Sequence, residues 1–291
     1  LAEAMVLPDF DLAHTPEKVF AYPKPAEAGA VRSHAGGVLV QQCGWAKARA
    51  GTLGLTPQGK ALLADMTIDS IKSGLQAMIM DKAFDEMHRI NHIRGQSGKG
   101  KRQMTDAWKR RDAIFNALEE FPTQTWISFD EVFRAITALG HRFHVVEKYS
   151  YCLYFDSPNY GNLGDSQDEL NRAYLRVFLM ESLATLGIID IAYSAPHGLF
   201  PEFEDAWGID DLDFISRYDG LSHIRINHFG EYCLDLASEY EAPEATVSKI
   251  FRLMPNLEIA LTGTQDIDLP DKAKLEQIAT AQGKSIWVLN Q

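Results

Sequence analysis

The sequence predicts a mainly α fold with small β wings (α+β class), made of tandem winged helix-turn-helix modules and a small C-terminal βαβ-like piece. Three observations predict it. Apolar residues recur at helical spacing along most of the chain. A short strand, a polar residue, a glycine and a helix start occur together twice, in residues 51–63 and 222–236. The final residues instead alternate strand, helix and strand. These patterns divide the chain into residues 1–36, 37–110, 111–245 and 246–291.

The first two segments give an extended arm and a first winged-helix-like module. Residues 1–36 contain closely spaced prolines and little periodicity, which favours an extended arm. Residues 37–50 fit a helix weakened by Gly44. Residues 52–55 then fit one strand of a wing, and Pro57 sets the turn into the next helix. Residues 66–93 continue as an amphipathic helix, and the basic linker completes this module at residue 110.

Residues 111–245 contain the more complete of the two predicted winged-helix patterns. A helix is expected over 111–121, and Ser128 with Glu131 forms a capping box for the next helix. A polar, aromatic loop covers 140–165, and a long helix covers 168–186, where Gly187 stops it. Strands over 188–194 and 221–227 enclose a long insertion. Three helices and a decorated two-stranded wing predict a second winged-helix module.

The last segment differs from both modules. A strand from Asn256, a helix over 269–283 with Pro270 in its first turn, and a strand over 285–291 form the expected βαβ-like piece.

Composition limits the class of protein. The 291 residues are 46% hydrophobic, enough for a core divided over two or three domains. Because no stretch approaches 18 uninterrupted apolar residues, we expect no membrane partner, and the N-terminus lacks the pattern of a signal peptide. The three scattered cysteines suit a reducing cytoplasm better than a disulfide framework or a metal knuckle. A cytoplasmic protein is therefore predicted.

Charge is uneven along the chain. The formal net charge of −12 argues against general affinity for phosphate backbones. Basic residues nevertheless dominate between residues 82 and 111, so local contact with double-stranded DNA is expected there. The alternative is a solvated segment, and the glycine-rich run over 95–102 is either a phosphate contact or a linker. The DNA-binding candidates of this segment are Arg94, Lys99, Lys101, Arg102, Lys109, Arg110 and Arg111.

The second module offers a different set of candidates. The helix over 168–186 would enter the major groove if this module binds DNA. Asn171, Arg172 and Arg176 could then read bases, and Arg225 on the wing could contact a phosphate. Acidic residues at the start of the same helix would repel DNA, so Arg172 and Arg176 could instead pair with nearby acids. This acidic module is therefore slightly favoured as a protein-docking surface.

Catalytic and metal motifs are weak. The histidine pairs 88/92 and 141/144 lack the remaining features of a metal site. No Gly-x-Ser-x-Gly elbow, EF-hand loop or P-loop lysine motif is present. We predict a non-catalytic protein with no cofactor and no metal.

One resemblance covers most of the chain. Trp45-Ala46 through Gly51, followed by Leu55-Thr56-Pro57-Gln58-Gly59, resembles a wing motif, and residues 254–278 resemble a strand and helix that follow it. Both occur in the accessory, non-motor region of bacterial XPB-class helicases and their helicase-conserved-C-terminal relatives. The resemblance implies an adaptor or DNA-binding module, because this chain carries no motor motif.

Two hypotheses follow. The first is a DNA-backbone-binding protein that uses the first module and the basic linker within a helicase- or nuclease-type repair or anti-phage assembly. The alternative is a protein–protein interaction scaffold whose acidic second module docks such a partner without binding DNA.

Overall fold

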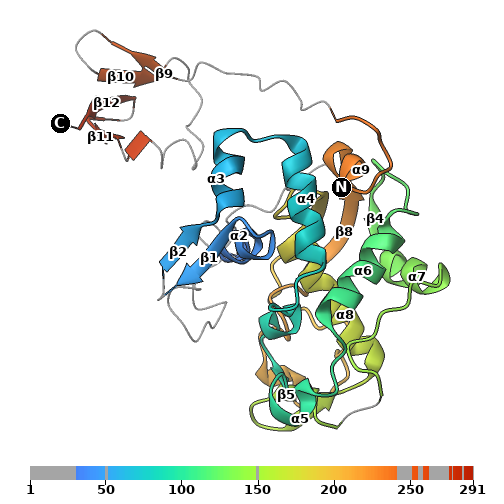
Figure 1. The fold of residues 1–291 in the computed structure, drawn as a ribbon. Coiled ribbons are helices and arrows are strands. Elements are labelled where there is room, and N and C mark those ends of the chain that lie inside the picture. The colour runs from blue at the N-terminus through green and yellow to red at the C-terminus, as the bar shows by residue number, and fades with distance from the viewer. Residues whose placement is uncertain are drawn as a thin grey trace. The chain divides into compact units, whose positions relative to one another are not determined.

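A computed structural model describes residues 31–49, 52–148, 151–240, 251–254, 258–261, 275–276, 278–283 and 285–290 (Figure 1). The chain forms two compact units, Leu1–Tyr240 and Glu241–Gln291. Residues 1–30 of the predicted arm lie outside the described residues. Residues 31–36 are helical, so this last part of the arm is not extended.

The first unit opens with a helix, a hairpin and two more helices. Gly44 adopts φ +75°, which ends the first helix and turns the chain into the hairpin. Helix therefore covers only the start of the predicted helix over 37–50, and the predicted helix over 66–93 ends near its middle. The elements are α2 (Val31–Gln42), β1 (Ala46–Arg49), β2 (Thr52–Leu55), α3 (Pro57–Ala64), α4 (Ile68–Ile79) and the 3-10 helix η2 (Glu86–Arg89).

The rest of this unit alternates short strands with helices. Its elements are β3 (Ile93–Arg94), α5 (Gly98–Lys101), α6 (Ala107–Leu118), β4 (Ile127–Ser128), α7 (Phe129–Ala138), β5 (Tyr154–Ser157), β6 (Gly161–Gly164), α8 (Gln167–Val177), the π-helical η3 (Phe178–Leu183), β7 (Ile189–Tyr193), η4 (Ile209–Asp211), β8 (Leu221–Ile226) and α9 (His228–Cys233).

Several boundaries follow from local chemistry. Ser128 and Glu131 form the predicted capping box at the start of α7, which is confirmed. Ser166 and Glu169 form a second capping box at the start of α8. Gly187, at φ +78°, ends the long helical stretch as predicted.

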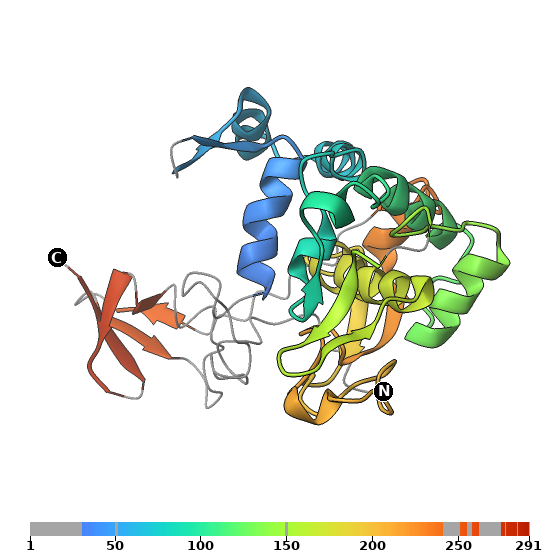
Figure 2. The same cartoon turned by 90° about the horizontal axis from the view of Figure 1, so that it is seen from below.

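Three antiparallel sheets support this unit. β7 and β8 pair as predicted, and β4 adds to the other side of β8 to give the order β4-β8-β7. A separate sheet, β3-β5-β6, includes residues from the predicted loop over 140–165. The β1–β2 hairpin stands alone and projects beyond the helices of the unit (Figure 2).

One hydrophobic core runs through the first unit from Val31 to Leu234. It contains side chains from both predicted modules, for example Met78 from α4 and Ile114 from α6 beside Tyr174 and Phe178, all fully buried. Each large apolar side chain buried in this way contributes about 1.5–3 kcal/mol. The predicted boundary between residues 110 and 111 falls inside α6, and the core is continuous across it.

The second unit is a small sheet with its own core. β9 (Phe251–Leu253), β10 (Glu258–Leu261), β11 (Ala279–Ala281) and β12 (Ile286–Leu289) pair antiparallel in the order β11-β12-β10-β9. Ile259, Leu275, Ala279 and Trp287 form the core. The predicted helix over 269–283 is wrong at residues 279–281, which form a strand, and residues 269–274 lie outside the described residues. The antiparallel sheet replaces the expected βαβ-like piece.

The prediction of a mainly α fold of tandem winged-helix modules was wrong. The described residues are mixed in class, with 39% helix and 22% strand, and they form four sheets. The extra strands are short, and β3 pairs with a strand about sixty residues away, so they leave little local periodicity in the sequence. None of the described helices is long and apolar enough to cross a membrane.

Candidate nucleic-acid interface

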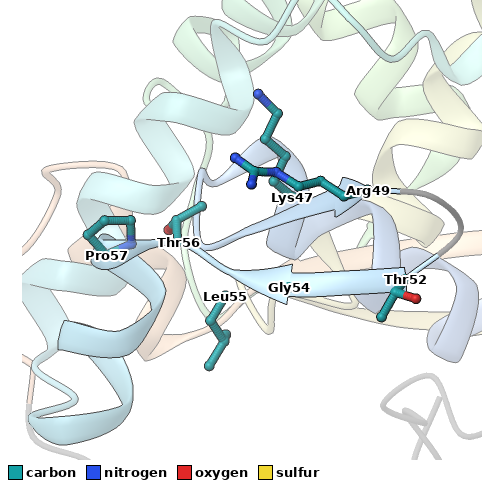
Figure 3. Close-up of a pocket in the computed structure, with 7 residues that line it drawn as sticks. All are labelled: Lys47, Arg49, Thr52, Gly54, Leu55, Thr56 and Pro57. Carbon is teal, nitrogen blue, oxygen red and sulfur yellow. The ribbon is translucent and has the colours of Figure 1, made fainter.

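The β1–β2 hairpin presents two cations on one face. Lys47 and Arg49 are two residues apart on β1, so their side chains leave the same face of the hairpin, while Leu55 leaves the other (Figure 3). Their partners across the hairpin, Gly54 and Thr52, are small. The two long cationic side chains therefore stand over a low, open surface.

A shallow pocket of about 330 Å³ lies at this face and continues toward Thr56 and Pro57. Lys47 and Arg49 are exposed, and within the described ranges of the chain neither makes an ion pair. A phosphate group could reach both cations without displacing a carboxylate. We call this surface the hairpin face.

The exit from the hairpin is held rigidly. The Thr56 hydroxyl donates to the carbonyl oxygen of Gly44 (2.7 Å) and accepts from the backbone amide of Gly59 (3.0 Å), which caps α3. Gly59 is required here, because a Cβ at this position would lie 1.9 Å from the carbonyl oxygen of Trp45. These contacts fix the hairpin relative to α3.

A second group of exposed cations lies around α5. Lys99, Lys101 and Arg102 are exposed, and none has an ion-pair partner among the residues that the structure describes. Gly100 anchors this turn, since a Cβ there would come within 2.2 Å of the carbonyl oxygen of Gly95. The bridge between Met104 and Val146 brings Lys148, also exposed, near Arg102. We call Lys99, Lys101, Arg102 and Lys148 the basic turn.

Two other predicted contacts at this end are already paired. The Arg94 guanidinium donates to Asp156 (2.7 Å), although its side chain remains exposed. Lys109 is exposed, lies 3.1 Å from Asp106 and approaches the ring of Trp108. Both could contact DNA only by giving up part of these interactions.

Arg110 and Arg111 are buried, which contradicts their prediction as DNA contacts. Arg110 donates to Asp85 (2.5 Å) and stacks over the Tyr174 ring at 4.4 Å. Arg111 is fully buried and donates to Glu86 at 2.7 Å and to backbone carbonyl oxygens of the segment before η2. Burial is the largest single effect and disfavours its charge, but Glu86, Tyr174 and Asp81 together outweigh burial and raise the pKa of Arg111.

Helix α8 keeps two of its three predicted base-reading residues away from solvent. Asn171 and Arg176 are buried, so their prediction as base-reading residues is wrong. Asn171 accepts from the backbone amide of Val145 (2.9 Å), and Arg176 makes a bidentate pair with Glu202 at 2.6 and 2.7 Å. For Arg176, pairing with a nearby acid is thus what the structure shows.

Arg172 and Arg225 are partly accessible, but both already donate hydrogen bonds to carboxylates. Arg172 donates to Asp130 (2.6 Å) and to Asp168 (3.2 Å). Arg225 donates to Asp190 (2.5 Å), and its guanidinium lies over the Trp126 ring at 4.8 Å. These contacts hold β8 and α8 in place and leave little capacity for a phosphate.

The structure therefore separates the predicted residues by burial. It exposes Lys99, Lys101 and Arg102, which have no ion-pair partner among the residues it describes, and it buries Arg110, Arg111, Asn171 and Arg176. Sequence reasoning missed Lys47, Arg49 and Lys148. The i, i+2 spacing of Lys47 and Arg49 before Gly51 was a usable signal for the first two, whereas the position of Lys148 depends on a distant strand bridge.

Within the described part of the chain, no group of three or more His, Cys, Asp or Glu residues is arranged to hold a metal ion. Comparison with protein-family models, curated proteins and solved structures gave no match. The resemblance to the XPB-class accessory region stays a prediction.

Proposed function

We propose that this protein binds the phosphate backbone of double-stranded DNA through the hairpin face and the basic turn. One observation carries the proposal. In a chain of net charge −12, Lys47, Arg49, Lys99, Lys101 and Arg102 are exposed and have no internal ion pair among the described residues. Phosphate contacts depend on such available cations, which release counterions from DNA when they bind.

The proposed binding is tolerant of sequence. Neither cationic surface offers a long series of side chains to the major groove, since each hairpin strand has four residues and α5 spans only Gly98–Lys101. Backbone contacts position a protein on DNA and carry little sequence information. A role within a helicase- or nuclease-containing repair or anti-phage assembly rests on the resemblance described above.

A cytoplasmic location belongs to the same proposal. Cys43 and Cys233 are buried free thiols. Burial raises the pKa of Cys43 and of Cys233 to about 12, so both thiols stay protonated and unreactive at neutral pH. This state suits a reducing compartment.

The test is fluorescence anisotropy with a labelled duplex of about 20 base pairs, at several salt concentrations between about 50 and 200 mM. The intact chain is compared with two variants, Lys47→Ala/Arg49→Ala and Lys99→Ala/Lys101→Ala/Arg102→Ala. We expect each to weaken binding about tenfold or more at low salt, and the slope of log affinity against log salt to flatten by roughly 0.9 per lost contact.

The matched control is Arg134→Ala/Arg142→Ala, which removes two exposed cations elsewhere on the first unit. This variant should bind like the unmodified protein, apart from a small change due to net charge. If the unmodified chain does not bind the duplex at about 50 mM salt, or if the control loses as much affinity as the two test variants, the proposal is wrong.

A further inference from the structure

Two exposed aromatic side chains meet on the first unit, away from the proposed DNA contacts in sequence. Trp207 is 82% exposed and Tyr160 is 55% exposed. Their rings pack edge to face, with centroids 6.0 Å apart. Large aromatic side chains are normally buried, and such side chains in solvent are enriched where proteins bind partners.

The pair is held by contacts between the β5–β6 turn and the segment before η4. Tyr160 packs over Gly208, where a Cβ would lie 2.4 Å from the tyrosine ring, and Gly208 adopts φ +89°. The Ser157 hydroxyl donates to the carbonyl oxygen of Gly208 (3.3 Å), and the Asn159 amide donates to Asp211 (2.7 Å). The aromatic rings are therefore preorganised, which lowers the entropic cost of binding.

Available carboxylates lie close to Trp207 in the sequence. Residues 197–213 contain no lysine or arginine. Glu204, Asp205 and Asp210 are exposed, and none makes an ion pair with another described residue. Glu202 in the same segment differs, because Arg176 neutralises it. Among the lysine, arginine, aspartate and glutamate residues of this segment, the exposed charge is thus entirely negative.

We propose that this surface, formed by Tyr160, Trp207, Glu204, Asp205 and Asp210, binds a lysine- or arginine-rich segment of a partner protein. A cation over the indole face is attracted by the ring quadrupole, and adjacent carboxylates pair with its neighbouring cations. The same carboxylates repel nucleic acid and anionic lipid. This binding is independent of the proposed DNA contacts, which use other residues.

The probe is a fluorescein-labelled peptide of nine lysines, titrated with the full chain and followed by anisotropy at about 50 and 150 mM salt. We expect Trp207→Ala to weaken peptide binding about fivefold or more. The variant Glu204→Gln/Asp205→Asn/Asp210→Asn should weaken it about tenfold. A peptide of nine glutamates should not bind.

Two matched variants separate a specific site from general attraction to an acidic protein. Tyr151→Ala removes another aromatic side chain, which is 77% exposed, and Asp65→Asn/Glu147→Gln/Glu239→Gln removes three exposed charges elsewhere. Both should bind the peptide like the unmodified chain. The proposal is overturned if nonalysine does not bind at low salt, or if Trp207→Ala and the acidic triple variant match these controls. DNA binding should be unchanged by Trp207→Ala, so failure of either proposal leaves the other testable.

Discussion

Burial determines what each basic residue of α6 does. Lys109, Arg110 and Arg111 are consecutive, yet only Lys109 reaches solvent. Arginine suits the buried positions because its planar guanidinium offers several donors and keeps its charge. Arg111 uses them to join α6 to Glu86 and to the backbone before η2. Two of these three consecutive cations, which predicted DNA binding, therefore form ion pairs inside the protein.

The residue-scale prediction concerns the buried ion pair between Arg111 and Glu86. Arg111→Met leaves the Glu86 carboxylate buried without this cation, and among the described residues the Tyr174 hydroxyl (3.0 Å) is the one side-chain donor to it that remains. We expect the free energy of unfolding to fall by about 3–5 kcal/mol. Urea denaturation followed by circular dichroism measures this loss. The control is Lys109→Met, next to the buried arginines on the same helix. It should change the free energy of unfolding by less than about 0.5 kcal/mol. Equal losses in the two variants would show that the buried ion pair is not the cause.

At the scale of elements, local signals predicted two helix ends and the pairing of β7 with β8, but they missed the ends of α2 and α4 and the β3-β5-β6 sheet. The capping box at Ser128 and the stop at Gly187 depend on neighbouring residues, so they could be recognised directly. The pairing of β3 with β5 joins Ile93 to Phe155, and no short-range pattern specifies it. The residues of β5 and β6 consequently resembled a loop, and the strand content was underestimated.

The element-scale prediction uses two glycines in helices. Alanine normally stabilises a helix relative to glycine by up to about 1 kcal/mol. At Gly37 in α2, an alanine Cβ would meet no heavy atom within 4 Å, so Gly37→Ala should stabilise the protein. Gly59→Ala in α3 would place a methyl group 1.9 Å from the Trp45 carbonyl oxygen, so it should destabilise the hairpin exit. Hydrogen exchange of the β1–β2 amides measures the local effect; slower or unchanged exchange in Gly59→Ala would contradict this interpretation.

At the scale of the whole molecule, the candidate site was only partly predictable because tertiary burial selects among the basic residues. Lys99, Lys101 and Arg102 could be chosen from the sequence, since a glycine-rich polar run favours the surface. The burial of Arg176 depends on Glu202 in a distant segment and could not be inferred. The same long-range contacts merge the two predicted modules into one core. Charge in the sequence therefore indicates where cations are, and packing decides which of them a ligand can reach.

Glu181 of η3 shows how far such packing extends. It is buried where segments distant in sequence meet, and burial raises its pKa to about 7 despite the opposing effect of Arg89. Its side-chain contacts are the guanidinium of Arg89 in η2 at 2.8 Å, the hydroxyl of Tyr218 and the imidazole of His34 in α2 at 3.9 Å. Arg217 also favours its charged form, and Glu86 disfavours it.

This raised pKa predicts how stability depends on pH. Between the usual carboxyl pKa of 4.5 and about 7, the native state keeps a proton on Glu181 that the unfolded chain has lost. The stability that protonated Glu181 contributes is therefore complete below pH 4.5 and is lost as the pH rises through 7. Between roughly pH 5.5 and 8, the free energy of unfolding should fall by about 2 kcal/mol. Glu181→Gln should remove that part of the pH dependence in urea denaturation, whereas the exposed Glu147→Gln should keep it. An identical pH slope in both variants would mean that Glu181 titrates at its ordinary pKa, so that Arg89 and Tyr218 fully offset its burial.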